Sequence, residues 1–180
     1  MVRVDYSEAK KHITSLRSAI RERTETGLYA ALDGFRVSQE HWLKEKKRRL
    51  LRPGIVDDAQ ALYKRVKEEN RLLQECEKVL PLDPVANPKE FEDLVAAIDR
   101  LDPPFEHPTV TRARNKWGAR AEMVRVLKDL RRGVEIYSKA KLSKAMKEAS
   151  ALESEWGRFV PAALYEECDD ALELIRSEAE

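Results

Sequence analysis

Residues 57–80 have the sequence DDAQALYKRVKEENRLLQECEKVL, in which apolar side chains recur at alternating steps of three and four. This is the spacing of the a and d positions of a heptad repeat, interrupted at Glu69, and it predicts a helix of about three heptads. Asp57 can cap this helix, with Gln60 three residues later. The stripe fits either a neighbouring helix or a second chain. It consists of Ala59, Leu62, Val66, Leu73, Cys76 and Leu80.

Helical patterns also flank this stretch, separated by breaks. A first helix starts near Asp5, a break falls at residues 24–27, and a second helix ends before Pro53-Gly54. After a proline-punctuated connector at residues 81–88, Pro88 fits the first position of a short helix. Further helices are predicted from Pro108, around Leu142 and from Pro161. The apolar face of the longest one is expected to hold Val110, Ala113, Trp117, Ala121, Val124, Leu127, Leu130, Val134 and Tyr137.

The composition favours the same fold class. Charged residues make up 37% of the 180-residue chain and glycines number only 6, which is typical of long helices and unlike a β-sandwich or an α/β sheet. We therefore predict an all-α protein of six or seven helices, arranged as consecutive antiparallel hairpins or an irregular bundle. Residues 1–180 are expected to form one domain, with sub-units at 1–52, 53–102 and 103–180.

Apolar segments long enough for membrane insertion are missing from the sequence. No stretch approaches the ~20 residues that span a bilayer, and the N-terminus has no apolar signal core. Cys76 and Cys168 lie inside helical patterns and are expected to be reduced and packed. These features predict a soluble, cytoplasmic protein without a membrane span.

Charge is unevenly distributed although the net charge is only +1. Residues 1–52 and 112–147 carry +6 and +9, whereas residues 53–111 and 148–180 carry −6 and −8. The alternation suggests that neighbouring helices complement each other's charge. The low net charge provides no global field that would attract nucleic acid or membrane.

The reactive residue types form no recognisable catalytic or metal-binding pattern. The three histidines, His12, His41 and His107, are scattered, and His107 before Pro108 is best explained as a loop or capping residue. Motifs such as G-x-S-x-G, Glu-x-x-His, C-x-x-C and the phosphate-binding loop are absent from the sequence. We predict no catalytic residue, no metal site, no cofactor and no enzymatic activity.

The sharpest local feature is the segment from Trp42 to Arg52, with six basic residues and one acidic residue. It can be interpreted as a basic amphipathic helix that docks into a calmodulin-like groove, or as a contact for phosphates or an acidic protein surface. The favoured alternative is a solvated helix face whose Trp42 and Leu50 pack in the core. The candidate partner-binding residues are Trp42, Lys44, Lys46, Lys47, Arg48, Arg49 and Arg52.

A second basic tract covers residues 112–132. Together with residues 44–52 it gives an alternative function, nucleic-acid binding by a helical protein. However, its basic residues are spread around the helix and Trp117 and Val124 interrupt them, whereas a nucleic-acid groove favours one continuous stripe. Pairing with the acidic C-terminal helix is therefore the preferred interpretation.

Three helix segments begin alike: Leu16-Arg17-Ser18-Ala19-Ile20, Leu94-Val95-Ala96-Ala97-Ile98 and Leu142-Ser143-Lys144-Ala145-Met146. Each is followed by a break and a second helix, which suggests repeated helical hairpins. The pattern resembles helical-hairpin segments of large ciliary and cytoskeletal scaffold proteins. The resemblance implies a non-enzymatic scaffold that binds other proteins, associated with the cytoskeleton or a cilium. A homodimer through helix 57–80 is a further expectation.

Overall fold

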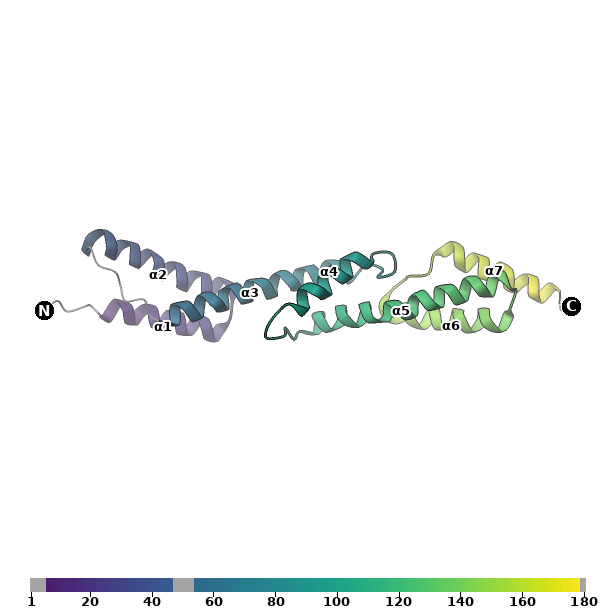
Figure 1. Cartoon of the computed structure of the whole chain (residues 1–180), viewed down its shortest axis with the longest axis horizontal. Coiled ribbons are helices and arrows are strands. Elements are labelled where there is room, and N and C mark those ends of the chain that lie inside the picture. Colours follow the sequence, from purple (N-terminus) through teal and green to yellow (C-terminus); the bar gives the residue numbers. More distant parts are fainter. Residues whose placement is uncertain (1–5, 47–53, 179–180) are drawn as a thin grey trace. The chain divides into compact units, whose positions relative to one another are not determined.

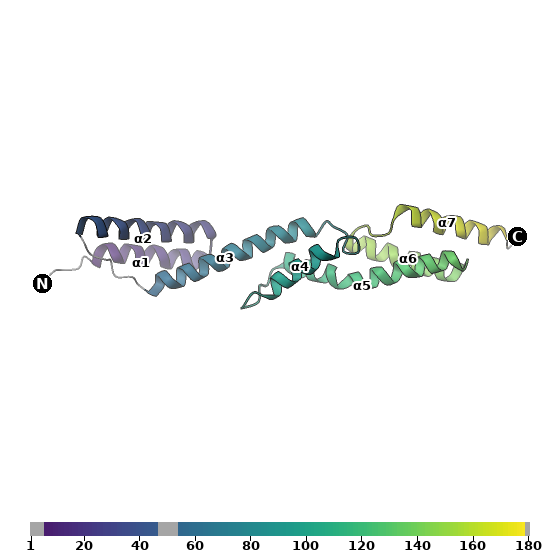
Figure 2. The ribbon, with the colours of Figure 1, turned by 45° about the horizontal axis from the view of Figure 1, so that its top comes forward.

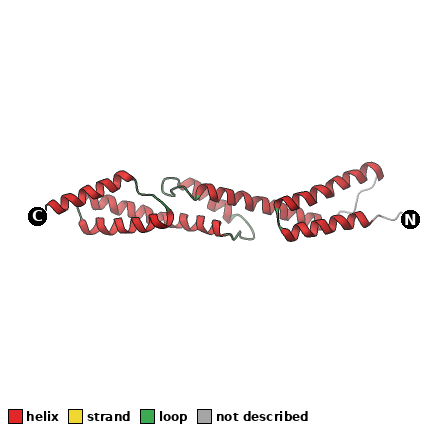
Figure 3. Ribbon diagram, turned by 180° about the vertical axis from the view of Figure 1, so that it is seen from behind, coloured by secondary structure: helices red, strands yellow, loops and turns green. Residues whose placement is uncertain are grey.

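The computed structural model describes residues 6–46 and 54–178, and every regular element in these ranges is an α-helix (Figure 3). This confirms the predicted all-α class. The helices along the described chain (Figure 1) are α1 (Tyr6–Glu22), α2 (Glu25–Lys46), α3 (Gly54–Val79), α4 (Pro88–Asp99), α5 (Pro108–Glu135), α6 (Lys139–Trp156) and α7 (Ala162–Ser177).

The chain divides into two compact units, Met1–Arg71 and Leu72–Glu180, here called the N-terminal and C-terminal units. The division falls inside α3, which contains neither proline nor a glycine after its first residue. The predicted sub-unit boundaries after residues 52 and 102 mark breaks between helices and do not coincide with this division. That residues 1–180 fold as one domain stays a prediction.

In the N-terminal unit, α1 and α2 form an antiparallel hairpin, visible in both Figure 1 and Figure 2, and the first half of α3 packs on it. The hairpin turn is shorter than the break predicted at residues 24–27. Thr24 Oγ1 accepts a hydrogen bond from the Gly27 amide, so Thr24 acts as N-cap and α2 begins at once. The core of this unit holds Leu16, Ala19, Leu28, Ala31, Phe35, Val56, Ala59 and Val66.

The C-terminal unit has two cores, and α5 contributes to both. The end of α3, α4 and the first half of α5 enclose Leu72, Cys76, Val79, Phe91, Leu94, Ile98, Val110 and Ala113. The second half of α5 forms a three-helix core with α6 and α7, whose largest apolar members are Met123, Val126, Leu127, Leu130, Leu142, Phe159, Val160 and Leu164. Both cores therefore depend on one 28-residue helix.

Several predicted helix ends are confirmed. Pro88 and Pro108 begin α4 and α5. His107 is the N-cap of α5, because its Nδ1 accepts the Thr109 amide at 3.2 Å. These positions were predictable because proline, glycine and capping residues act locally.

The buried stripe of α3 differs from the predicted heptad at its C-terminal end. Leu72 and Val79 are buried, whereas Leu73 and Leu80 are only partly buried. A straight helix repeats every 3.6 residues and drifts from a strict heptad, which shifts the buried face by one position. Glu69, the predicted interruption, is itself buried.

The α3 stripe packs within its own chain. Ala59 and Val66 lie in the N-terminal core, and Cys76 lies in a core of the C-terminal unit. Of the two predicted partners, the structure therefore provides the neighbouring helices. A homodimer through helix 57–80 stays a prediction, and the buried residues Ala59, Val66 and Cys76 are not available to it.

The apolar face of α5 also differs from the prediction. Ala121 and Tyr137 are exposed, whereas Met123 and even Lys116 are buried. The helix presents one face to the core with α4 and a different face to the core with α6 and α7. A single stripe along the whole helix could not describe both.

Two hairpin turns contain a non-glycine residue in the left-handed region. Arg23, after α1, has φ 52° and Tyr137, after α5, has φ 45°. This conformation costs an L-residue about 1 kcal/mol because Cβ approaches the backbone. At the second turn Tyr137 N bonds to Val134 O and Ser138 N to Gly133 O, which is the Schellman arrangement that normally has glycine at the tyrosine's position.

The α1–α2 turn is anchored on α3. Arg23 Nη2 donates to both carboxylate oxygens of buried Glu69, at 2.9 and 3.1 Å, and Arg65 Nε donates to the same carboxylate at 2.7 Å. One residue further on, Asn70 Nδ2 donates to Glu25 at 2.9 Å. The left-handed conformation of Arg23 thus brings its guanidinium to a buried carboxylate.

Candidate interaction surfaces

The structure places Trp42 inside the N-terminal unit. Its side chain is 7% exposed and its indole N–H donates to the Glu8 carboxylate. This agrees with the interpretation in which Trp42 packs in the core, and it removes the indole from the predicted partner-binding surface. Lys44 is exposed on α2. The side chains of Lys46, Lys47, Arg48, Arg49 and Arg52 lie outside the described residues, so their role stays a prediction.

The first half of the basic tract 112–132 serves the fold of the C-terminal unit. Lys116 is 5% exposed and its ammonium donates to the Leu80 carbonyl at 2.8 Å, just beyond the end of α3. Burial lowers the pKa of Lys116, and the Asp83 carboxylate opposes this shift. A cation at this position satisfies a helix-terminal carbonyl that would otherwise be unpaired.

The neighbouring arginines of α5 also have internal partners. Arg114 pairs with Asp99 of α4. Arg120 Nε donates to the Pro84 carbonyl at 3.1 Å, and its guanidinium lies 5.3 Å from the centre of the Trp117 ring. These side chains fix the connector and α4 on α5 and are not available as a phosphate-binding stripe.

Arg125 marks the end of this internally paired group. It forms ion pairs with Glu122 and Asp129 of its own helix and with Glu148 of α6, the last at 2.8 Å. In the described chain the acidic partners of the tract therefore lie on α4, α5 and α6, and none of the ion pairs reaches α7, where the sequence had predicted them. The later basic residues Lys128, Arg131 and Arg132 are exposed.

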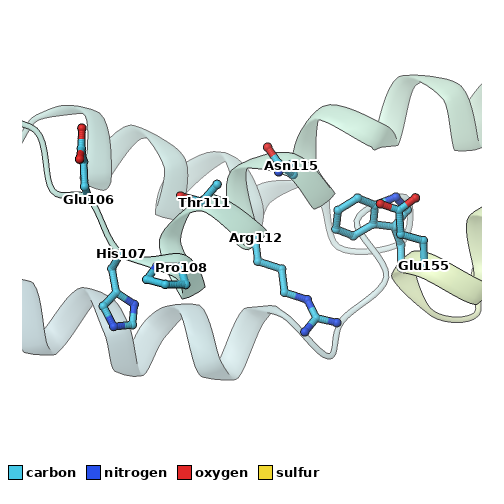
Figure 4. Close-up of a pocket in the computed structure, with 8 residues that line it drawn as sticks. Glu106, His107, Pro108, Thr111, Arg112, Asn115 and Glu155 are labelled. Atoms are coloured by element: carbon cyan, nitrogen blue, oxygen red, sulfur yellow. The ribbon is translucent and has the colours of Figure 1, made fainter.

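A pocket of about 640 Å³ lies beside the start of α5 and the end of α6 (Figure 4). The Arg112 side chain points toward the part of the pocket that holds Glu155, whereas the Glu106 and His107 side chains lie at the opposite end and do not point toward Glu155. His107 is already the cap of α5, and its ring stacks on Phe105. The polar groups do not converge on one point as a nucleophile, a base and an orienting group would.

A larger groove, of about 820 Å³, lies between α2 and α3 in the N-terminal unit. Its apolar part includes Leu32, Phe35 and two tyrosines, Tyr29 and Tyr63, whose ring centres are 6.1 Å apart. Tyr29 is 59% exposed, so a large apolar ring faces solvent at the groove. We call this surface the α2–α3 groove; the sequence did not single it out.

The rim of the α2–α3 groove is charged but balanced. On α2, Arg36 forms ion pairs with Asp33, one turn before it, at 2.8 Å and with Glu40, one turn after it, at 2.7 Å. Lys64 of α3 lines the opposite side. An apolar floor between mixed charges is typical of a surface that takes an amphipathic partner helix. Tyr29, an aromatic residue one turn before Leu32 on α2, was the available sequence signal.

The described residues hold no group of three or more histidine, cysteine or acidic side chains able to bind a metal. Both cysteines are buried and unpaired by a disulfide, and burial raises the pKa of the Cys76 and Cys168 thiols. None of the described helices combines the length and apolarity needed to cross a membrane.

Comparison with known proteins gives no relative. No family model matches the chain, and neither the curated proteins nor the solved structures include a significant match.

Proposed function

We propose that the protein is a non-enzymatic interaction module whose α2–α3 groove binds an amphipathic helix of another protein. The carrying observation is the exposed Tyr29 ring opposite Tyr63, over an apolar floor. Exposed aromatic residues at the centre of a groove are typical anchors of protein interfaces, because they bury a large area with few rotatable bonds.

The chemistry of the groove favours a helix with one apolar stripe. Such a helix presents apolar side chains at i, i+3, i+4 and i+7, which matches a floor bounded by two helices. The Asp33–Arg36–Glu40 ladder on one side and Lys64 on the other provide both charge signs, so the partner helix needs no strong net charge.

The scaffold role in a cytoskeletal or ciliary assembly is part of the proposal. It is supported by the resemblance of the three segments that begin at Leu16, Leu94 and Leu142 to hairpins of such scaffold proteins. Leu16, Leu94 and Leu142, which begin these segments, are all buried in helix cores. Helical cores that present docking grooves would suit this role.

The test compares two exposed apolar residues in the full chain. Tyr29→Glu places a charge in the groove, and Leu174→Glu makes the same kind of change on α7, where the side chain is 50% exposed. Affinity capture from the native source, followed by cross-linking and peptide identification, measures which partner contacts the groove. We expect Tyr29→Glu to lower the recovery of that partner about tenfold or more, with recovery retained by Leu174→Glu.

Three outcomes contradict parts of this proposal. Equal recovery by wild type and Tyr29→Glu would rule out the groove as the docking site. A cross-linked partner segment without helical apolar spacing would rule out the helix-in-groove mode. Failure of the tagged chain to co-fractionate with cytoskeletal structures that contain the partner would rule out the scaffold setting alone.

A further inference from the structure

The turn between α5 and α6 combines exposed apolar side chains with unpaired cations. Ile136 and Tyr137 are 50% and 57% exposed at its tip. In the described chain the Tyr137 side chain forms no hydrogen bond or ring contact, although its backbone adopts the left-handed conformation. A glycine would satisfy the same backbone geometry, so the fold does not require this aromatic ring.

Basic residues surround the tip on both helices. Arg131 and Arg132 lie near the end of α5, which finishes at Glu135, and Lys139 and Lys141 lie in the first turn of α6. All four are exposed. The first turn of α6 carries no acidic residue, and positive charge there opposes the helix dipole. The two lysines therefore stand where helix stability alone would favour acidic side chains.

The structure separates these cations from the rest of the basic tract. Lys116, Arg120 and Arg125 have internal partners, as described above. Among the described residues, no ion pair is formed by Arg131, Arg132, Lys139 or Lys141. Arg132 and Lys141 line a pocket together with Asp129 and Glu148 but form no ion pair with them, so all four cations are able to act on an external partner.

We propose that the α5–α6 turn docks on an anionic phospholipid bilayer, with Ile136 and Tyr137 entering the headgroup region. Ile136 and Tyr137 are both exposed at the turn and line neither of the two pockets described above, which fits a partner that supplies a deformable apolar medium. A bilayer does so, and tyrosine favours its interface. Cations on both arms of the turn match a two-dimensional array of negative headgroups.

The position of α7 limits the orientation of docking. Figure 1 and Figure 2 both place the C-terminal end of α7 at the same end of this core as the α5–α6 turn. The last turns of α7 and its C-cap carry the exposed acidic residues Glu173 and Glu178. Its negative charge would be repelled by the headgroups, so the bilayer meets the core on the α5–α6 side.

The test measures co-sedimentation of the full chain with lipid vesicles. Vesicles of phosphatidylcholine alone are compared with vesicles containing about one third phosphatidylserine. We expect binding only to the anionic vesicles, and we expect added salt to weaken it. Lys139→Gln with Lys141→Gln is expected to weaken binding about 20-fold, and Tyr137→Gly about tenfold.

These variants are chosen because neither should unfold the protein. Tyr137→Gly relieves the left-handed strain, and the lysine substitutions remove charge that opposes the α6 dipole, so both should melt no lower than the wild type. The matched control is Lys10→Gln with Lys11→Gln, which removes two exposed lysines of α1. It is expected to leave vesicle binding unchanged.

Three results would overturn the proposal. The first is no binding to anionic vesicles at low salt. The second is equal loss of binding in the Lys10/Lys11 control, which would indicate an unspecific charge effect. The third is binding of the turn to a nucleic-acid duplex or an acidic peptide, but not to vesicles, with the same dependence on Tyr137 and the two lysines.

Discussion

Two hairpin turns of this protein have the same left-handed backbone conformation at a residue that is not glycine, but the two residues differ. The α1–α2 turn places Arg23 in the left-handed region, and the α5–α6 turn places Tyr137 there. Arg23 reaches the buried carboxylate of Glu69, which compensates the strained backbone with two hydrogen bonds. Tyr137 points its ring into solvent, where no described residue compensates the same strain.

The difference separates a structural turn from a candidate functional one. A strained residue is expected to persist either because the fold uses its side chain or because a partner does. Arg23 belongs to the first case, since its bond to Glu69 holds the hairpin on α3. Tyr137 belongs to the second under the docking proposal. The predictions below test this division, beginning with the largest expected effect.

Glu69→Ala should be the most damaging change at the anchored turn. It removes the acceptor shared by Arg23 and Arg65 and leaves the Arg65 guanidinium, with a side chain 17% exposed, without this partner. We expect the free energy of unfolding of the N-terminal unit to fall by about 3 kcal/mol. Chemical denaturation measures it through the fluorescence of Trp42, in a background in which Trp117 and Trp156 of the C-terminal unit are replaced by Phe.

Glu68→Ala is the control for this change. Glu68 is exposed and pairs with Arg71 within the same helix, where an ion pair contributes less than about 0.5 kcal/mol. An equal loss of stability in both variants would show that the α1–α2 turn is not anchored by the buried carboxylate.

Gly133→Ala should disturb the α5–α6 turn through packing. A Cβ at this position would lie 2.8 Å from Leu142 Cδ2, closer than real contacts allow. We expect a loss of about 2 kcal/mol in the unfolding free energy of the C-terminal unit, measured by denaturation. Gly118→Ala, in the same helix with no atom near its new Cβ, should instead gain about 1 kcal/mol. Equal effects at both positions would contradict the close approach of α6.

Glycine substitution at the two left-handed residues should have opposite signs. Tyr137→Gly removes strain without losing a hydrogen bond or ring contact and should gain about 1 kcal/mol. Arg23→Gly gains the same relief but loses two charge-assisted hydrogen bonds, so it should lose about 1 kcal/mol overall. Thermal and chemical unfolding of the two variants measure both signs. A destabilising Tyr137→Gly would mean that the fold uses the ring.

The sequence predicted the local features well and the long-range ones poorly. Pro88 and Pro108 were correctly predicted to begin helices, because the effect of a proline depends on neighbouring residues alone. The roles of Glu69 and Lys116 could not be predicted, since each depends on a partner more than 30 positions away, such as Arg23 or Leu80. Periodicity treated Glu69 as an interruption, and the basic tract that contains Lys116 was expected to pair with the acidic C-terminal helix.

The candidate surfaces were predicted in part. Residues 112–132 were identified as basic, but the pairing of Arg114 and Arg120 inside the unit depends on the tertiary fold. Tyr137 was expected on the apolar face because it continues the helical spacing of α5. The spacing ends with the helix at Glu135, and the left-handed turn then carries Tyr137 outward.

The α6–α7 connection provides a third turn, and its test has the smallest expected effect. Glu153 accepts the amides of Phe159 and Val160, at 3.2 and 3.0 Å, and the Tyr165 hydroxyl at 3.0 Å. As in the α1–α2 turn, a single carboxylate accepts the hydrogen bonds that hold the connection in place. Burial, followed by the hydrogen bond to Glu153, raises the pKa of Tyr165 to about 12 from its ordinary value of 10.0.

The raised pKa sets the direction of an alkaline effect. In the unfolded chain Tyr165 loses its proton near pH 10, whereas in the folded unit it keeps it to about 12. The stabilisation by the neutral hydroxyl is therefore complete below about pH 10 and is lost as the pH rises toward about 12. Denaturation of wild type and Tyr165→Phe at several alkaline pH values should show a shallower decline in the variant. Tyr137→Phe, at a turn without a carboxylate, should decline like the wild type; if all three curves coincide, Glu153 does not close the α6–α7 turn through Tyr165.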